Sequence, residues 1–252
     1  MEGIKRTTFQ GVINIVRFNW QFYVIAIITI AGLQYGKQFL PVSVQFFADI
    51  FLFLSALAIL ISLAVSLYIY DLSNLYTLDW LAASSPKQIV TINAGFDETS
   101  ALLAQKYPSA TMQVFDFYDP VKHTEVSIER ARKAYPPYPG TQTISTAAVP
   151  LKENSTDIIF LILAAHEIRN EQERIVFFEQ FKKALNPSGK IFVVEHQRDF
   201  VNFMAYNFGF FHFHSTATWK KTFKAAGLTL EKEFKITPFI STFVLSKHGT
   251  TS

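Results

Sequence analysis

The chain has 252 residues, and half of them are apolar, which is a high share for a soluble enzyme. A formal charge of +3, with no run of lysine or arginine, argues against a nucleic-acid partner. Because the chain has no cysteine, disulfides, thiolate metal sites and cysteine nucleophiles are excluded. The apolar excess lies in the first 70 residues or so, and the rest has the composition of an ordinary globular domain.

Two apolar stretches stand near the N-terminus. Residues 18–36 carry no charge and are just long enough to cross a hydrocarbon core of ~30 Å. Residues 42–70 carry only Asp49, close to the intervening loop, where we expect an interfacial, solvated carboxylate. The short linker 37–41 predicts an antiparallel transmembrane hairpin. A signal peptide is the alternative for the first stretch, but a second span follows at once and no small-residue cleavage site precedes it.

Basic residues flank this hairpin unequally. Lys5, Arg6 and Arg17 precede the first span, whereas only Lys37 lies between the two spans. The positive-inside rule therefore places both the N-terminus and the C-terminal domain in the cytoplasm. The expected organisation is a cytoplasmic segment, a two-helix transmembrane hairpin, a linker and a globular domain, at 1–17, 18–70, 71–87 and 88–252.

The globular part alternates between strand and helix patterns. Strands are expected at 88–93, 111–115, 142–145, 156–163, 190–194, 228–236 and 239–246. Helices are expected at 98–106, 122–135, 171–185 and 217–226. Such alternation predicts right-handed βαβ units and an α/β fold with a doubly wound, Rossmann-like, mostly parallel sheet of about seven strands. Ligands of these sheets bind beyond the carboxyl ends of the central strands.

Three segments carry a family resemblance. They are Ile89-Val-Thr-Ile-Asn-Ala-Gly-Phe-Asp-Glu-Thr-Ser100, Gln113-Val-Phe-Asp116, and Val149-Pro-Leu-Lys-Glu-Asn-Ser-Thr-Asp157 with Leu185-Asn-Pro-Ser-Gly-Lys190. Over about residues 88–247 the chain resembles the class I S-adenosylmethionine (SAM)-dependent methyltransferases with a type 11-like domain. The resemblance implies SAM as the cofactor and methyl transfer as the reaction.

Two residues fit cofactor contact on physical grounds. Gly95 lets backbone N–H groups approach a ligand closely at a helix N-terminus. Asp116, at the end of the second strand, can accept hydrogen bonds from both ribose hydroxyls. The alternative is that Gly95 forms an ordinary turn and that Asp116 caps a helix.

The resemblance implies further contacts but also shows departures. Asn93, Gly95 and Asp97 align with the three positions of the family's glycine-rich loop, and Ser145 replaces an aspartate that often contacts adenine. Ala164, at the end of the fourth strand, completes the expected set. An anionic Asp97 suits the sulfonium or amino group of SAM and would repel a pyrophosphate, which argues against NAD. The altered loop leaves open that cofactor binding has been lost.

Histidines cluster where the carboxyl edge of the sheet is expected. His166 and Glu167 follow the fourth strand, and His196 ends the fifth. A histidine of near-neutral pKa can deprotonate a phenol, enol or amine before methyl transfer, so His166 is the first candidate for the base and His196 the second, beside Glu167. No metal is expected in this interpretation. A competing one is that two histidines with two glutamates bind Fe, Zn or Mn.

The segment 200–213 is unusually rich in aromatic residues. It fits a lid over a hydrophobic substrate, a contact with lipid headgroups, or packing against neighbouring helices.

The leading prediction is a membrane-anchored methyltransferase acting on a lipophilic quinol, pigment, polyene or lipid, with assembly into a membrane protein complex left open. The alternatives are a catalytically degenerate fold that serves as a membrane scaffold and a metal-dependent enzyme on the same fold.

Overall fold

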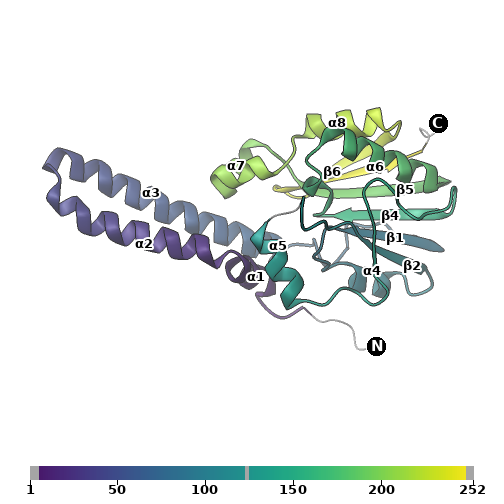
Figure 1. Cartoon of the computed structure of the whole chain (residues 1–252), viewed down its shortest axis with the longest axis horizontal. Helices are drawn as coiled ribbons and strands as arrows, with labels where there is room; N and C mark the ends of the chain where they lie inside the picture. Colours follow the sequence, from purple (N-terminus) through teal and green to yellow (C-terminus); the bar gives the residue numbers. More distant parts are fainter. Residues whose placement is uncertain (1–5, 123–124, 248–252) are drawn as a thin grey trace.

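A helical hairpin projects from an α/β domain (Figure 1) in the computed structural model, which describes residues 6–122 and 125–247. The N-terminal elements are α1 (Gln10–Phe18), α2 (Trp20–Gly36), η1 (Lys37–Phe39), α3 (Val42–Leu67) and η2 (Tyr68–Leu72). In the described part of the chain, α3 and η2 form one helix of 31 residues that is long and apolar enough to cross a membrane. The helices α1 and α2 meet at a bend of 70° and meet the same criterion only when taken together as one span.

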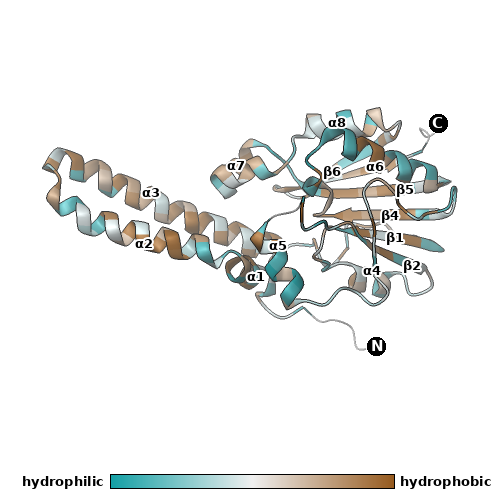
Figure 2. Cartoon of the chain, viewed as in Figure 1, coloured by the Kyte–Doolittle hydropathy of each residue, from teal (hydrophilic) through white to brown (hydrophobic). Residues whose placement is uncertain are grey.

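Apolar residues run along both helices of the hairpin (Figure 2), and many of their side chains are exposed. No residue of α2 is buried, and α3 buries only three. A helix that is apolar on every face is typical of a protein core or of a membrane span. Lys37 and Asp49 form an ion pair near the tip of the hairpin, so the one charge within α3 lies at the loop end.

The domain is built on one seven-stranded sheet. Its strands are β1 (Gln88–Asn93), β2 (Thr111–Asp116), β3 (Gln142–Thr143), β4 (Thr156–Ile162), β5 (Leu185–His196), β6 (Thr229–Thr237) and β7 (Ile240–Ser246). The order is β3-β2-β1-β4-β5-β7-β6, with β7 antiparallel to β5 and to β6 and all other pairs parallel. The Rossmann-like, mostly parallel architecture expected from the sequence is therefore confirmed.

Helices cover the sheet and extend its loops. They are α4 (Ser100–Lys106), α5 (Val126–Ala134), η3 (Ala165–Glu167), α6 (Glu171–Ala184), α7 (Phe200–Tyr206), η4 (Asn207–His212) and α8 (Thr216–Ala225). The main core lies between the sheet and the pair α6 and α8, where Phe177, Phe181, Trp219 and Phe223 are fully or almost fully buried. Packing on this face fixes the central strands and so the positions of their carboxyl ends.

The helix α1 is tied to the end of the membrane-length helix. Both carboxylate oxygens of Asp71 accept hydrogen bonds from the backbone N–H groups of Gly11 and Val12, at 2.7 and 2.8 Å. A Cβ atom on Gly11 would lie 2.3 Å from the Cβ of Tyr70, so the two backbones approach this closely only because residue 11 is glycine. As a result α1 lies against the domain instead of extending away from it (Figure 1).

Some element limits differ from the expectations. The strand expected at 190–194 begins at Leu185, since Leu185 already pairs with Thr156 before an irregularity in the register. The segment 200–213 is largely helical, and Asp199 caps α7 by accepting a hydrogen bond from the N–H of Asn202. The helix expected from 122 begins at Val126. Lys5 and residues 123–124 and 248–252 lie outside the described residues.

Candidate active site

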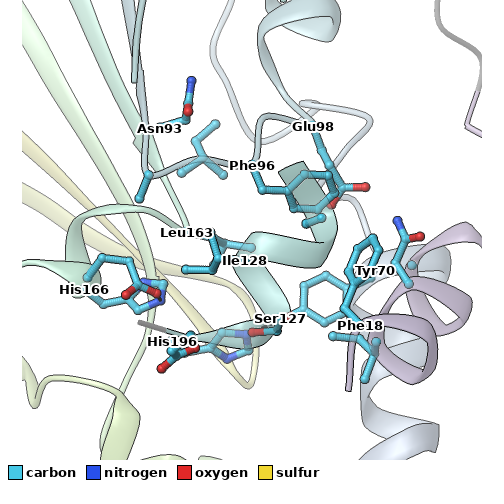
Figure 3. A pocket seen from close by; sticks show the side chains of 18 of the residues that line it. Phe18, Tyr70, Asn93, Phe96, Glu98, Ser127, Ile128, Leu163, His166 and His196 are labelled. Carbon is cyan, nitrogen blue, oxygen red and sulfur yellow. Dashed lines mark hydrogen bonds and ion pairs between the residues drawn. The ribbon is translucent and has the colours of Figure 1, made fainter. Parts of the chain in front are cut away.

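A cavity of about 250 Å³ lies at the carboxyl ends of β1, β4 and β5 (Figure 3). Its sheet side carries Asn93, His166 and His196, three residues that the sequence predicted for the site. Phe18 of α1 and Tyr70 of η2 lie on the other side (Figure 3). The cavity is thus bounded partly by the Rossmann-like domain and partly by the base of the hairpin.

His166 is held by a fully buried carboxylate. Its Nδ1 lies 2.6 Å from Oε2 of Glu195, and Oε1 of Glu195 accepts hydrogen bonds from the N–H groups of Ala164 and His166. With both oxygens engaged, Glu195 is fixed, and the Nδ1–H of His166 donates to it. The opposite nitrogen, Nε2, lies 3.2 Å from Oε1 of Glu167.

Glu167 links this pair to a second histidine. Oε1 of Glu167 is 3.2 Å from Nε2 of His212, and Nδ1 of His212 is 2.7 Å from Oε1 of Glu125. The rings of His166 and His212 have centroids 5.0 Å apart. All four side chains line the cavity, so two imidazoles and two carboxylates meet at one wall.

The carboxylates reverse the effect of burial on His166. Burial alone would lower the pKa of His166, but Glu195 and Glu167 outweigh it and raise the pKa to about 10. Burial would raise the pKa of Glu167, but hydrogen bonds with His166 and His212 hold it well below its ordinary value. The raised pKa favours the protonated form of His166 over the neutral ring that a general base needs.

His196 differs from His166 in its protonation state and in its hydrogen-bond partners. Burial lowers the pKa of His196 to about 4, so its ring is neutral. Nδ1 lies 3.0 Å from Oδ1 of Asn202, whose amide group donates to Asp199 and to the carbonyl of Phe239. Nδ1–H therefore donates to Asn202, and Nε2 accepts from the Tyr70 hydroxyl at 2.9 Å. His196 thus joins the end of the membrane-length helix to the sheet.

The turn after β1 is built around Gly95 and two polar side chains. Gly95 has φ +99°, a left-handed conformation that glycine adopts without strain. Oδ1 of Asn93 accepts a hydrogen bond from the N–H of Gly95, and Oδ1 of Asp97 accepts from those of Thr99 and Ser100. The side chains of Asn93 and Asp97, at the two positions where the family's loop has glycine, therefore stabilise the turn by hydrogen bonds to its backbone.

Asp116 lies where the sequence predicted it, beside Asn93 at the end of β2. Its carboxylate is already engaged, because Oδ2 pairs with Arg132 of α5 and Oδ1 accepts from the N–H of Tyr118 at 2.9 Å. Arg132 also covers Gly95, where an added Cβ would lie 3.1 Å from the guanidinium. The space that a ribose would need next to Asp116 is held by the side chain of Arg132.

The remaining predicted cofactor residues lie apart from the main cavity. Oδ2 of Asp97 is buried and has no hydrogen-bond partner among the described residues, so a donor such as an amino group would satisfy it. Ser145 lines a second hollow beside β3, and its hydroxyl accepts from the N–H of Ala147. Ala164 is buried behind His166 and contributes only its N–H to Glu195.

The charges in the cavity are acidic. Glu98, Glu125 and Glu167 line it, and no lysine or arginine does so among the described residues. Glu98 is compensated from outside by Arg6 at 2.6 Å. Such a lining favours neutral or cationic guests and disfavours a pyrophosphate.

Several site residues were not foreseen. Glu125 and Arg132 belong to the connection between β2 and β3. The path of this connection over the sheet edge cannot be predicted from the local sequence pattern. Phe18 and Tyr70 reach the site through the packing of α1 on η2, and Glu98 lies between β1 and α4. A carboxylate directly after an apolar span, Asp71, was the one available hint of that packing.

Known structures share this fold. No protein-family model matches the sequence, and no curated protein matches it. A chain of the complex between the Haloferax volcanii Trm112 methyltransferase activator and a methyltransferase is 12% identical, with a TM-score of 0.51 over 69% of this chain and 88% of that one. An O-methyltransferase family 2 protein from Planctomyces limnophilus, solved with apigenin, is 13% identical, with a TM-score of 0.52 over 76% and 62%.

A SAM-dependent methyltransferase from Aquifex aeolicus is also similar, at 12% identity and a TM-score of 0.48 over 67% of this chain and 86% of that one. At such identities the likeness concerns the fold. The α/β domain has the fold of the SAM-dependent methyltransferases, here with N-terminal helices added at the edge of the sheet where the cavity lies.

Proposed function

We propose that this chain is a membrane-anchored, SAM-dependent methyltransferase that acts on a lipophilic small molecule. The observation that carries the proposal is the position of the cavity. It lies at the ligand-binding edge of a methyltransferase-type sheet and is bounded on the other side by α1 and the end of the membrane-length helix.

The residues around the first turn fit SAM once one side chain moves. Gly95 gives the open turn, Asp116 the ribose-binding carboxylate, and the unpartnered oxygen of Asp97 suits the amino group. Arg132 has to leave Asp116, and its long side chain, about a third exposed, is free enough to do so. SAM, when bound, supplies a methyl group activated by a sulfonium charge, which the acidic cavity tolerates.

The other side of the cavity fits an apolar acceptor. Ile15, Phe18, Phe96, Leu163 and Phe213 give it an apolar surface. Glu167 is ionised and reaches the cavity, so an acceptor hydroxyl or amine can donate to its carboxylate while His166 fixes that carboxylate's position. We assign Glu167 to orient the acceptor through this hydrogen bond, His166 to fix the carboxylate of Glu167, and His196 to position Tyr70.

Membrane anchorage is part of the proposal. A two-span hairpin with the domain on the cytoplasmic side follows from the excess of basic residues before the first span. The segment 200–211 adds support, because α7 packs against α3 and most of its apolar side chains are exposed. Phe213, in contrast, lines the cavity, so the aromatic segment faces both the proposed membrane and the site.

The direct test is methyl transfer into the membrane phase. Membranes containing the full chain are incubated with SAM that carries a tritiated methyl group and are then extracted with organic solvent. We expect label in the organic extract from the wild type, and loss of most of it with Asp116→Ala. Label that stays in the aqueous phase, or that is equal in both proteins, would refute the proposal.

A scaffold function is the second candidate, and one observation favours it. Asp116 is paired with Arg132, and the N–H groups of the turn are bonded to Asn93 and Asp97 instead of remaining open to a ligand. In a chain that had lost cofactor binding, the Asp116–Arg132 pair and the hydrogen-bonded turn would never open to a ligand. Removal of Arg132 separates the two candidates, because only a binding protein gains SAM affinity from it.

A further inference from the structure

Three potential metal ligands converge at the cavity wall. Nε2 of His166 and Nε2 of His212 each lie 3.2 Å from the same atom, Oε1 of Glu167. The three ligand atoms all lie within 4.8 Å of one another. Ligands bound ~2.1 Å from a metal are ~3.0–3.4 Å apart in octahedral or tetrahedral geometry, and the two separations of 3.2 Å from Glu167 lie in that range.

Each imidazole is oriented by a further carboxylate. Nδ1 of His166 faces Glu195 at 2.6 Å, and Nδ1 of His212 faces Glu125 at 2.7 Å. When each Nδ1–H donates to its glutamate, both Nε2 lone pairs point toward the Glu167 oxygen. A cation between these three electron-pair donors would be bound by all of them, and carboxylate-supported histidines are the usual arrangement around bound metals.

We propose that His166, Glu167 and His212 form a two-histidine, one-carboxylate site for a divalent transition-metal cation. By ligand type, two histidines and one carboxylate are typical of Fe²⁺ sites and also suit Mn²⁺ or Zn²⁺. All three ligands line the cavity, so the positions left open on the cation face the space available to a substrate. In the proposed methyltransferase, and resting on that proposal, the cation would bind an acceptor oxygen and lower its pKa. The binding site itself does not depend on that function.

Two charges near the site bear on this proposal. Glu167 and Glu195 both lie next to His166, so two carboxylates would balance the charge of a divalent cation bound there. The exposed guanidinium of Arg169 contacts the ring of His212 and has to turn away when the cation binds. The competing arrangement is a hydrogen-bonded cluster held together by protons alone.

The test is a Co²⁺ titration of the detergent-solubilised, untagged full chain, followed through the visible absorption of bound Co²⁺. We expect one equivalent to bind, and His212→Gln to weaken binding roughly 100-fold, at the upper end of the effects seen around metal sites. The matched control is Glu98→Gln, which removes a carboxylate from the same cavity outside the cluster and leaves Co²⁺ affinity unchanged.

Glu125→Gln covers the case in which a ligand variant does not fold. Glu125 is exposed, so its replacement does not threaten the fold, and as the carboxylate behind His212 it should weaken binding roughly tenfold. Absence of Co²⁺ absorption, or equal affinity in the wild type, His212→Gln and Glu125→Gln, would establish the proton-held cluster and overturn the proposal. SAM affinity, measured separately, reports on the methyltransferase function, so the two failures are distinguishable.

Discussion

At the residue scale, the cofactor side of the site depends on one ion pair. Arg132 of α5 is bonded to Asp116 and also donates to the carbonyl of Gly95 at 3.3 Å. A ligand that binds Asp116 has to break a charged hydrogen bond worth about 1.5–3 kcal/mol. We therefore predict that Arg132→Ala binds SAM roughly tenfold more tightly than the wild type, as measured by isothermal titration calorimetry.

The neighbouring Lys133 gives the control for this change. It is exposed on the same helix and pairs with Glu129, so Lys133→Ala removes a positive charge without freeing Asp116. Its SAM affinity should match that of the wild type. Weaker binding by Arg132→Ala would mean that the arginine contacts the ligand, and the occlusion described above would be wrong.

His196 should make stability depend on pH. Its pKa is about 4 in the folded chain and about 6.5 when unfolded, so the unfolded state binds the extra proton first. The stability it contributes is complete above pH 6.5 and is lost as the pH falls toward 4, by up to about 3 kcal/mol. Chemical unfolding at pH 7, 5 and 4 measures this loss.

The comparison variant is His196→Gln, which cannot take up a proton. It should be less stable than the wild type at pH 7, because it loses the hydrogen bond with Tyr70, but its stability should change less between pH 6.5 and 4. An equal decline in both proteins would assign the acid sensitivity to other groups.

At the element scale, α1 adds a second wall to the cavity at the sheet edge. Its contact with η2 requires a residue without a side chain at position 11. We predict that Gly11→Ala lowers the free energy of unfolding by about 1–3 kcal/mol, the usual effect of overpacking, although alanine is the better helix former. Thermal unfolding in detergent measures the change.

Gly32→Ala is the matched substitution in α2. No atom lies within 4 Å of the added Cβ, so stability should stay the same or rise slightly. If Gly11→Ala is as stable as Gly32→Ala, then α1 does not pack against Tyr70 as described and the cavity lacks that wall.

The elements also show what the sequence could predict. Runs such as 88–93 and 156–162 are apolar and β-branched because both faces of the sheet are covered, and they were located correctly. His166 and His196 were expected to meet because parallel strands end at one edge, and both line the cavity. Glu125, Arg132 and Phe18 come from connections whose paths depend on contacts distant in sequence, which periodicity does not encode.

At the scale of the whole molecule, the hairpin and the aromatic segment lie on the same side of the domain (Figure 1). Phe208 in η4 is 83% exposed, and Val121, on the β2–β3 connection, is 84% exposed. Since the natural chain has no cysteine, single cysteines can be labelled at either position. We predict that a fluorophore on Phe208→Cys in lipid nanodiscs is quenched by brominated lipid, and that one on Val121→Cys is not.

Equal behaviour of the two labels would contradict a membrane contact at the aromatic segment. A third label, on Phe53→Cys in α3, reports on anchorage itself, because that position lies within the proposed span. Quenching at 53 without quenching at 208 would mean that α3 lies in the bilayer and that the aromatic segment does not contact it.

The proposed function requires that SAM binds at the carboxyl ends of β1 and β2. Calorimetric titration of the detergent-solubilised full chain with SAM measures this binding. We expect micromolar binding, and we expect Asp116→Ala to weaken it roughly 10- to 100-fold, as the loss of a charged hydrogen-bond acceptor would. No binding to folded wild type and to folded Arg132→Ala would contradict the account and leave a scaffold with the methyltransferase fold.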